Sequence, residues 1–327
     1  MRTFSASIAF RTDLAEEILE RYREKNTAPV PGLFSQKYVR NGFPVSLLRV
    51  LDEHGARVAE RPMGSYLTME VGKIWSADKQ RFQRAAEVFA ECIRALLPDT
   101  LSPDAPCMLV ALGNRGITAD AVGPMAAKHF IVTRHIKHAD RTLFDSLGLR
   151  ETVCVVPDVA GNTGMEAVEI ALGAAKKASP GVMLVVDALA SCRLERLATT
   201  LQISDTGLSP GSGVYNARPG FDQSTFGIPV LAIGVPTVVE VPTLALDVLE
   251  KALQELSRKG RFSISEEPSA LYEQLMQTVG EQNGEGFFVT PKETDHIIKD
   301  ISKLIGYALN LALHRELSFE EIDEFLS

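Results

Sequence analysis

The chain has few of the residues that mark metal-binding and redox domains. Its 327 residues include only four cysteines, at positions 92, 107, 154 and 192, and one tryptophan. The cysteines are far apart and form no C-x-x-C pair, which argues against a zinc ribbon or a thioredoxin-like motif. Reduced thiols, as in a cytoplasmic protein, are the simplest interpretation.

Long runs of one charge or of apolar residues are also missing. The 34 basic and 42 acidic residues give a formal net charge of -8 without a long basic run, which argues against direct binding of nucleic acid. Arg11 and Asp13 interrupt the N-terminal segment before it reaches the length of a signal peptide. The most apolar later stretch, 228–241, is broken by two prolines and Glu240 and is too short to span a membrane. We therefore expect a cytoplasmic protein without a membrane partner.

Apolar strands alternate with amphipathic helices in the centre of the chain. The pattern predicts helices at 79–97, 164–178 and 243–257, and strands at 107–112, 152–156, 182–187, 199–204 and 229–234. Strands that are apolar throughout are typical of parallel sheets buried on both faces. The alternation therefore predicts an α/β fold with a mostly parallel twisted sheet, flanked by helices on both faces.

The two ends of the chain differ from this centre. Residues 44–51 and 65–71 predict an antiparallel hairpin, appended to the main sheet within a region from 11 to 80. Residues 258–286 are polar and contain several glycines, so we expect a mobile excursion, and Thr290-Pro291 predicts the start of a last long helix. The length is compatible with a single domain covering residues 11–327.

Two aspartates follow apolar strands. Asp187 comes directly after residues 182–186, and Asp120 follows the strand at 107–112 across the loop 113–119. Because ligands in parallel sheets bind outside the carboxyl ends of the strands, we expect the two side chains to meet at one edge. Like-charge repulsion and partial burial would raise the pKa of one carboxyl, so that the pair shares a proton. Such a pair can supply an acid and a base.

Other interpretations of these residues remain open. Asp120 could belong to the first turn of a helix or to a loop, which is the commoner role of an isolated aspartate, and Asp187 could cap a turn. The two carboxylates could also bind a divalent metal, with His129, His135 or His138 as the third ligand. An isolated histidine is more often structural.

Glycine-rich loops and potential nucleophiles give weaker signals. The loops at 161–164 and 210–213 could hold an anion on backbone amides, but neither has Walker or dinucleotide-binding spacing. Ser212 or Cys192 could act as a nucleophile only with a histidine within hydrogen-bonding reach.

A set of longer motifs resembles the germination protease family of spore-forming bacteria. The motifs occur in the family's order over nearly the whole chain and lie at 11–15, 66–68, 112–114, 118–124, 132–135, 186–190, 202–207, 210–214, 228–239 and 289–293. The resemblance implies an endopeptidase that degrades small acid-soluble spore proteins during germination, and a fold similar to that of the hydrogenase-maturation peptidases. It also implies a homotetramer in the cytoplasm of the spore core, made as a zymogen with a short propeptide, here residues 1–10. The family's two functional aspartates correspond to Asp120 and Asp187, and no cofactor is expected.

The chain departs from the family pattern in three places. Residues 118–124 read Thr-Ala-Asp-Ala-Val-Gly-Pro where the family usually has Thr-Pro-Asp-Ala-Leu-Gly-Pro, which keeps the acid. Residues 1–10 contain no glutamate, although the family's cleavage sites typically carry one, which argues against self-processing there. The excursion at 258–286 is shorter than in familiar members.

The resemblance leads to a mechanistic hypothesis. Asp120 and Asp187 would flank a water and the scissile carbonyl, one as general base and one as general acid, within roughly 10 Å of each other. Backbone amides of 113–116 or 211–213 are candidate oxyanion donors. A metal-dependent peptidase of the maturation type and a non-catalytic protein-binding homologue are the alternatives.

Overall fold

A computed structural model of the chain describes residues 12–25, 28–208, 220–258, 287–314 and 316–326. The strands are β1 (Leu33–Arg40), β2 (Phe43–Val50), β3 (Gly64–Glu70), β4 (Cys107–Ala111), β5 (Thr152–Val155), β6 (Val182–Ser191), β7 (Thr200–Ser204), β8 (Val230–Glu240) and β9 (Phe288–Val289). The helices are α1 (Ala15–Lys25), α2 (Glu53–Ala59), α3 (Lys79–Leu96), α4 (Val122–Ala127), α5 (Arg134–Ala139), α6 (Arg141–Ser146), α7 (Ala160–Thr163), α8 (Ala167–Ala178), α9 (Gln223–Phe226), α10 (Val241–Arg258), α12 (Thr294–Leu313) and α13 (Phe319–Leu326).

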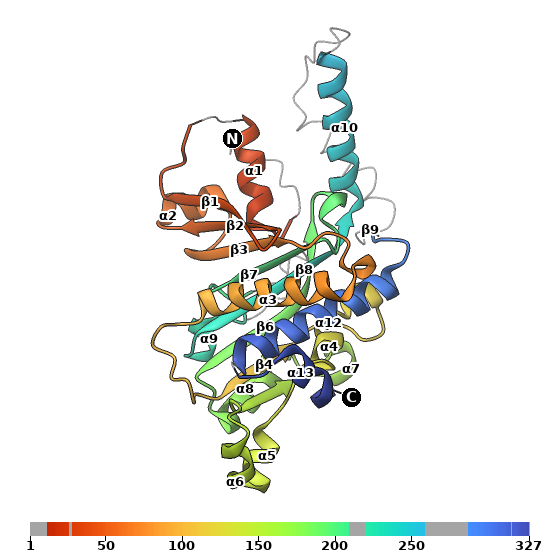
Figure 1. Cartoon of the computed structure of the whole chain (residues 1–327). Coiled ribbons are helices and arrows are strands. Elements are labelled where there is room, and N and C mark those ends of the chain that lie inside the picture. The colour runs from red at the N-terminus through yellow and green to blue at the C-terminus, as the bar shows by residue number, and fades with distance from the viewer. Residues whose placement is uncertain (1–11, 26–27, 209–219, 259–286, 315, 327) are drawn as a thin grey trace.

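All of these strands belong to one sheet in the order β1-β2-β3-β7-β8-β6-β4-β5, with β9 paired to β8 (Figure 1). The α/β class is confirmed, but the sheet is mixed, so the prediction of a mostly parallel sheet is wrong. Strands β5, β4, β6 and β8 are parallel neighbours, whereas β7, β3, β2 and β1 continue the sheet with antiparallel pairing. Strand β7 is buried along its whole length, but its sequence Thr-Leu-Gln-Ile-Ser alternates polar and apolar residues, which is typical of antiparallel pairing and differs from the continuous apolar runs of the parallel strands.

The predicted hairpin is present as β2 and β3, and it is an integral part of the main sheet. Strand β3 pairs with β7, with Tyr66 opposite Ser204, so the hairpin region continues the sheet without a break. The edge strand β1 was not predicted, because most of its side chains are exposed and it lacks a clear apolar alternation. Helix α2 lies within the connection between β2 and β3.

Helices pack on both faces of the parallel strands. In β4, Cys107 and Leu109 face the layer formed by α3, α4 and α12, whereas Met108 and Val110 face α8. Figure 1 shows α3 and α12 side by side across one face of the sheet, with α10 projecting beyond its upper end. The alternation of a strand's side chains between two faces thus builds two apolar layers on one sheet.

The predicted helices are present, with changes at their starts. The helix expected at 164–178 is present as α8, which begins three residues later because Glu166 and Glu169 form its capping box; the short helix α7 precedes the predicted range. Helix α12 begins at Thr294, four residues after Thr290. The possible propeptide at 1–10 and the excursion at 258–286, apart from Arg258 itself, lie outside the described residues.

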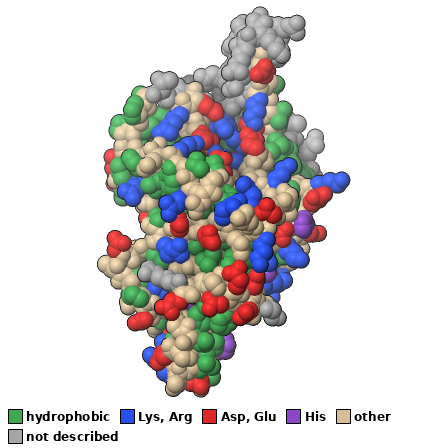
Figure 2. Space-filling model, in the orientation of Figure 1, with side chains coloured by type: hydrophobic (Ala, Val, Ile, Leu, Met, Phe, Trp, Pro, Cys, Tyr) green, Lys and Arg blue, Asp and Glu red, His purple; other side chains and the backbone are tan. Residues whose placement is uncertain are grey.

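The surface has no large area of one charge on the face seen in Figure 2, where Lys and Arg side chains are interspersed with Asp and Glu. No helix in the described ranges has both the length and the apolar character needed to cross a bilayer.

Gly123 sets how closely α4 approaches the sheet. A Cβ atom at this position would lie 2.2 Å from the Leu112 carbonyl oxygen and 2.7 Å from that of Val186. Both contacts are with backbone atoms, which cannot swing aside. The start of α4 therefore packs directly on β4 and β6, next to Asp120.

We expect Gly123→Ala to destabilise the fold by about 2 kcal/mol or more, as is typical of overpacked sites. Gly173→Ala is the matched control: this glycine is exposed in α8, and a Cβ atom added there would have nothing within 4 Å. The control should gain roughly 0.5–1 kcal/mol from its higher helix propensity. Chemical denaturation of both variants measures the difference, and equal stabilities would contradict the close packing at Gly123.

Candidate active site

Asp187 lies at a step in the sheet. Strand β6 pairs with β4 only as far as Val186, opposite Ala111, and then continues to Ser191 beside β8. Asp187 is therefore the first residue of β6 beyond the end of β4, opposite Gly234 of β8. The sequence pattern placed the end of the strand here because the carboxylate interrupts the apolar run, but pairing with β8 carries the strand further.

The loop after β4 brings Asp120 to the same step. Asp120 ends a 3-10 turn that leads into α4, and its Oδ2 accepts a hydrogen bond from the Asn114 backbone N–H at 2.8 Å. Gly113 has a φ of +121°, and a Cβ there would lie 1.8 Å from the Asp120 carbonyl oxygen. Only glycine fits this turn. Asp120 thus lies in a short 3-10 turn, close to the first-turn interpretation considered above, and it does not cap α4, which has no side-chain cap.

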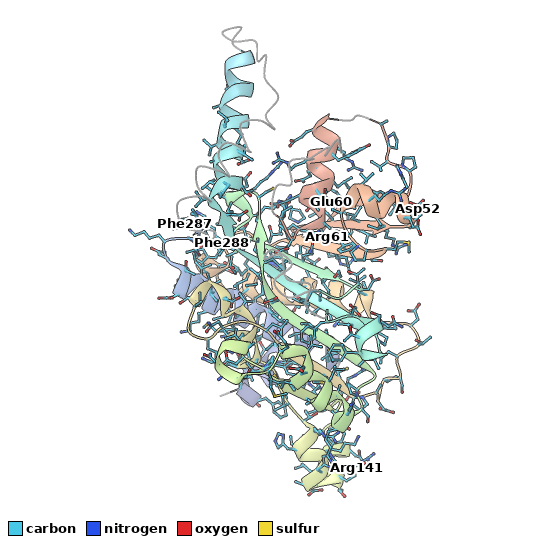
Figure 3. The ribbon with its side chains drawn as sticks, turned by 180° about the vertical axis from the view of Figure 1, so that it is seen from behind. Asp52, Glu60, Arg61, Arg141, Phe287 and Phe288 are labelled. Carbon is cyan, nitrogen blue, oxygen red and sulfur yellow. The ribbon has the colours of Figure 1, made fainter. Side chains whose placement is uncertain are left out.

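Both carboxylates line one cavity of about 660 Å³. The cavity lies among the ends of β6, β7 and β8, the segment around Arg61 and the strand residue Phe288. Figure 3 shows Arg61 and Phe288 on opposite sides of the upper ends of these strands. The structure thus brings Asp120 and Asp187 to one concave site, as expected from the strand pattern.

The two carboxyls differ in their affinity for a proton. Burial raises the pKa of Asp187 to about 8, and the nearby charges of Asp120 and Asp13 contribute to this rise, against a hydrogen bond from the Ala188 N–H at 2.9 Å. Burial also raises the pKa of Asp120, and the hydrogen bond from Asn114 opposes this rise. The surroundings therefore favour a proton on Asp187, with Asp120 as the carboxyl that ionises first.

The cavity wall also contains Asp13, an acidic residue that we did not predict. Its N–H donates to the Ala190 carbonyl oxygen at 2.9 Å, and its Oδ2 accepts from the Ala190 N–H at 2.7 Å. Gln202 Nε2 donates to the Asp13 carbonyl oxygen, and Arg61 donates to that of Thr12. The available signal was the motif at 11–15, which the resemblance singled out without assigning it to the site.

The candidate histidine ligands lie elsewhere. His129 packs against Tyr307 of α12, and His135 and His138 belong to the short helix α5. None of the three is in the wall of the cavity. Within the described ranges, no group of three His, Cys, Asp or Glu residues is arranged to hold a metal ion. The structure therefore does not bring these histidines to the aspartates, as the metal site considered from the sequence would require.

The structure places some of the other candidate groups. Cys192 is buried, and burial raises the pKa of its thiol, which disfavours the nucleophilic thiolate. Loop 161–164 forms the exposed turn around α7. The N–H groups of Asn114 and Gly116 are engaged by side chains of the same loop, so neither is free as an oxyanion donor. Ser212 and the loop 210–213 lie outside the described residues.

Comparison with known proteins gives a consistent result over the whole chain. A family model described as germination protease matches residues 11–271. The germination protease of Clostridium tetani is 36% identical over 331 residues, covering 98% of this chain and 100% of the relative. That of Caldanaerobacter subterraneus is 36% identical over 336 residues, covering 98% of each. That of Bacillus subtilis is 34% identical over 350 residues, covering 95% of each.

The raised pKa of Asp187 has a consequence for stability. Folding raises the pKa of this carboxyl from 3.8 to about 8. Between these pH values the carboxyl is ionised in the unfolded chain but protonated in the folded protein, so the free energy of unfolding falls as the pH rises. We expect Asp187→Asn to remove this loss, so that its stability advantage over the wild type grows by at most about 1.4 kcal/mol per pH unit and levels off above pH 8. Denaturation curves across neutral pH measure the advantage. A constant difference would contradict the raised pKa.

Asp13 should contribute to this effect through its charge. We expect Asp13→Asn to lower the pKa of Asp187, because the amide keeps an acceptor for the Ala190 N–H but removes the negative charge. The stability difference that Asp187→Asn produces, measured again in the Asp13→Asn background, should then level off at a lower pH. If the stability difference levels off at the same pH or at a higher pH, the expected repulsion between the two carboxyls is contradicted.

Proposed function

The chain belongs to the germination protease family and is a peptidase, and on this premise we propose that it hydrolyses small acid-soluble spore proteins using Asp120 and Asp187. The observation that carries the proposal is the shared cavity, in which two carboxylates sit in surroundings that separate their proton affinities. Pairs of titratable groups whose surroundings push their pKa values apart are typical of acid and base assignments.

The pKa shifts suggest which residue takes which role. Asp120 acts as the general base: it accepts a proton from a water molecule while the oxygen of that water attacks the scissile carbonyl carbon. Asp187 carries the proton and donates it to the leaving nitrogen as the C–N bond breaks. Asp120 gains one proton and Asp187 loses one. The pair therefore begins with its shared proton on Asp187 and ends with a proton on Asp120.

The volume and the lining of the cavity support a segment of polypeptide as the substrate. A cavity of about 660 Å³ is within the range that encloses a small ligand or a few residues of a chain. Its mixed lining includes Tyr66, Leu189 and Phe288, together with the polar side chains of Gln202 and Thr206. These groups offer both apolar contact and hydrogen bonds to a bound peptide.

The biological setting is part of the same proposal. The name germination protease, which the relatives carry, supports action during spore germination. The location of the substrates in the cytoplasm of the spore core is proposed from the family resemblance. The resemblance further suggests a homotetramer made as a zymogen, and a fold similar to that of the hydrogenase-maturation peptidases. Direct contact with nucleic acid is not part of the proposed function, in keeping with the charge of -8.

We expect purified wild-type protein to cleave a small acid-soluble spore protein, and Asp120→Asn and Asp187→Asn each to lose at least about 100-fold in kcat/KM, as is typical when a general acid or base is removed. The matched control is Asp145→Asn in α6, which pairs with Arg141 at the far end of the molecule from the cavity (Figure 3). It should cleave like the wild type.

The alternatives give different outcomes in the same assay. A chelator should leave the rate unchanged, and loss of activity that added divalent metal restores would favour the metal-dependent mechanism. Wild-type cleavage that both active-site variants retain would contradict the assignment of Asp120 and Asp187. Binding of the substrate without cleavage by the wild type would favour the non-catalytic alternative.

A further inference from the structure

A β-bulge interrupts the pairing of β6 and β8 just beyond Asp187. Leu189 lies opposite Pro236 and the next residue, Ala190, lies opposite Val238, so Thr237 has no partner on β6. Bulges change the direction of a side chain and are common next to active sites. The extra residue in β8 is thus a hydroxyl-bearing residue at the wall of the cavity.

Thr237 has a buried hydroxyl without a hydrogen-bond partner in the described part of the chain. The residue is only 1% exposed, and its Oγ1 is fully enclosed. Buried hydroxyl groups are normally paired, and an unpaired one is destabilising. Rotation about χ1 moves the oxygen to another staggered position on Cβ, and by such a rotation we expect it to turn toward the cavity that Thr237 lines.

Thr237 differs in its location from the other described residues that have a buried polar side-chain atom without a hydrogen-bond partner. The described residues with unpartnered buried nitrogen or oxygen atoms also include Arg150, Arg193, Ser302 and His314. None of these four is in the wall of the cavity. The unpaired hydroxyl of Thr237 therefore belongs to a residue that lines the place where the proposed substrate binds.

The register gives the distance of Thr237 from the reacting groups. Asp187 lies opposite Gly234, and Thr237 is three residues further along β8. At a rise of about 3.3 Å per strand residue, Thr237 lies roughly 10 Å from the level of Asp187. An extended peptide covers this distance in about three residues.

We propose that Thr237 is a substrate-positioning residue, whose hydroxyl forms a hydrogen bond with a backbone peptide group of the substrate about three residues from the scissile bond. This inference rests on the proposed peptidase function. A hydroxyl can donate to a carbonyl or accept from an N–H, so it can bind any extended chain whatever its side chains. The bound peptide then supplies the partner that the hydroxyl lacks in the free protein.

The test compares Thr237→Val, Thr237→Ser and Ser302→Ala in cleavage of a small acid-soluble spore protein. Valine keeps the shape and removes the hydroxyl, so we expect kcat/KM to fall roughly 3- to 10-fold, mainly through KM, the effect of one neutral hydrogen bond. Its Tm should equal or exceed that of the wild type, because the unpaired buried group is gone. Serine should restore kcat/KM to within about twofold.

Ser302→Ala is the matched control because it removes a buried, unpartnered hydroxyl in α12, away from the cavity. It should leave kcat/KM unchanged. Wild-type kcat/KM in Thr237→Val would overturn the inference, and so would a fall that accompanies a lower Tm and that serine does not restore. Either result would leave the peptidase function intact, whereas failure of the wild type to cleave the substrate would contradict the proposed function itself.

Discussion

The structure depends on the cost of keeping a carboxyl group inside a buried strand. Asp187 follows five fully buried apolar residues of β6. Desolvation penalises the ionised form, and the neighbouring Asp120 and Asp13 add repulsion. Because the group is most stable with a proton, the fold itself supplies an acid near neutral pH. The step at the end of β4 leaves this acid open to the cavity.

The surrounding structure keeps this arrangement rigid. The last residues of β6 are tied to the N-terminal helix, since buried Glu17 of α1 accepts hydrogen bonds from the Ser191 hydroxyl and the Cys192 N–H. Asp13 joins the same segment through Ala190. On the other side, the tight turn at Gly113 fixes Asp120. The site is therefore held by contacts between segments far apart in the sequence, and a catalytic pair needs such support to keep its geometry.

Part of this architecture could be predicted from the sequence and part could not. The apolar strands and the helix stripes indicated the α/β class and placed Asp120 and Asp187 at one edge, because burial imposes a local pattern. The alternation of polar and apolar residues in β7 was a signal of antiparallel pairing that the prediction did not use, whereas the edge strand β1 and the extension of β6 to Ser191 depend on pairing partners that the pattern does not encode. Asp13 was missed for the same reason: its role comes from hydrogen bonds to Ala190, which is 177 residues away.

The central claim is that Asp187 holds a proton near neutral pH because its carboxyl is desolvated at the wall of the cavity and lies near the charge of Asp120. It is tested most directly by a carbon-13 NMR titration of the Asp187 carboxyl in the wild type and in Asp120→Asn. The account expects a pKa of about 8 in the wild type and a lower pKa in the variant, since the repulsive charge is removed. A wild-type pKa near the ordinary aspartate value of about 4, or a value that Asp120→Asn leaves unchanged, would contradict it.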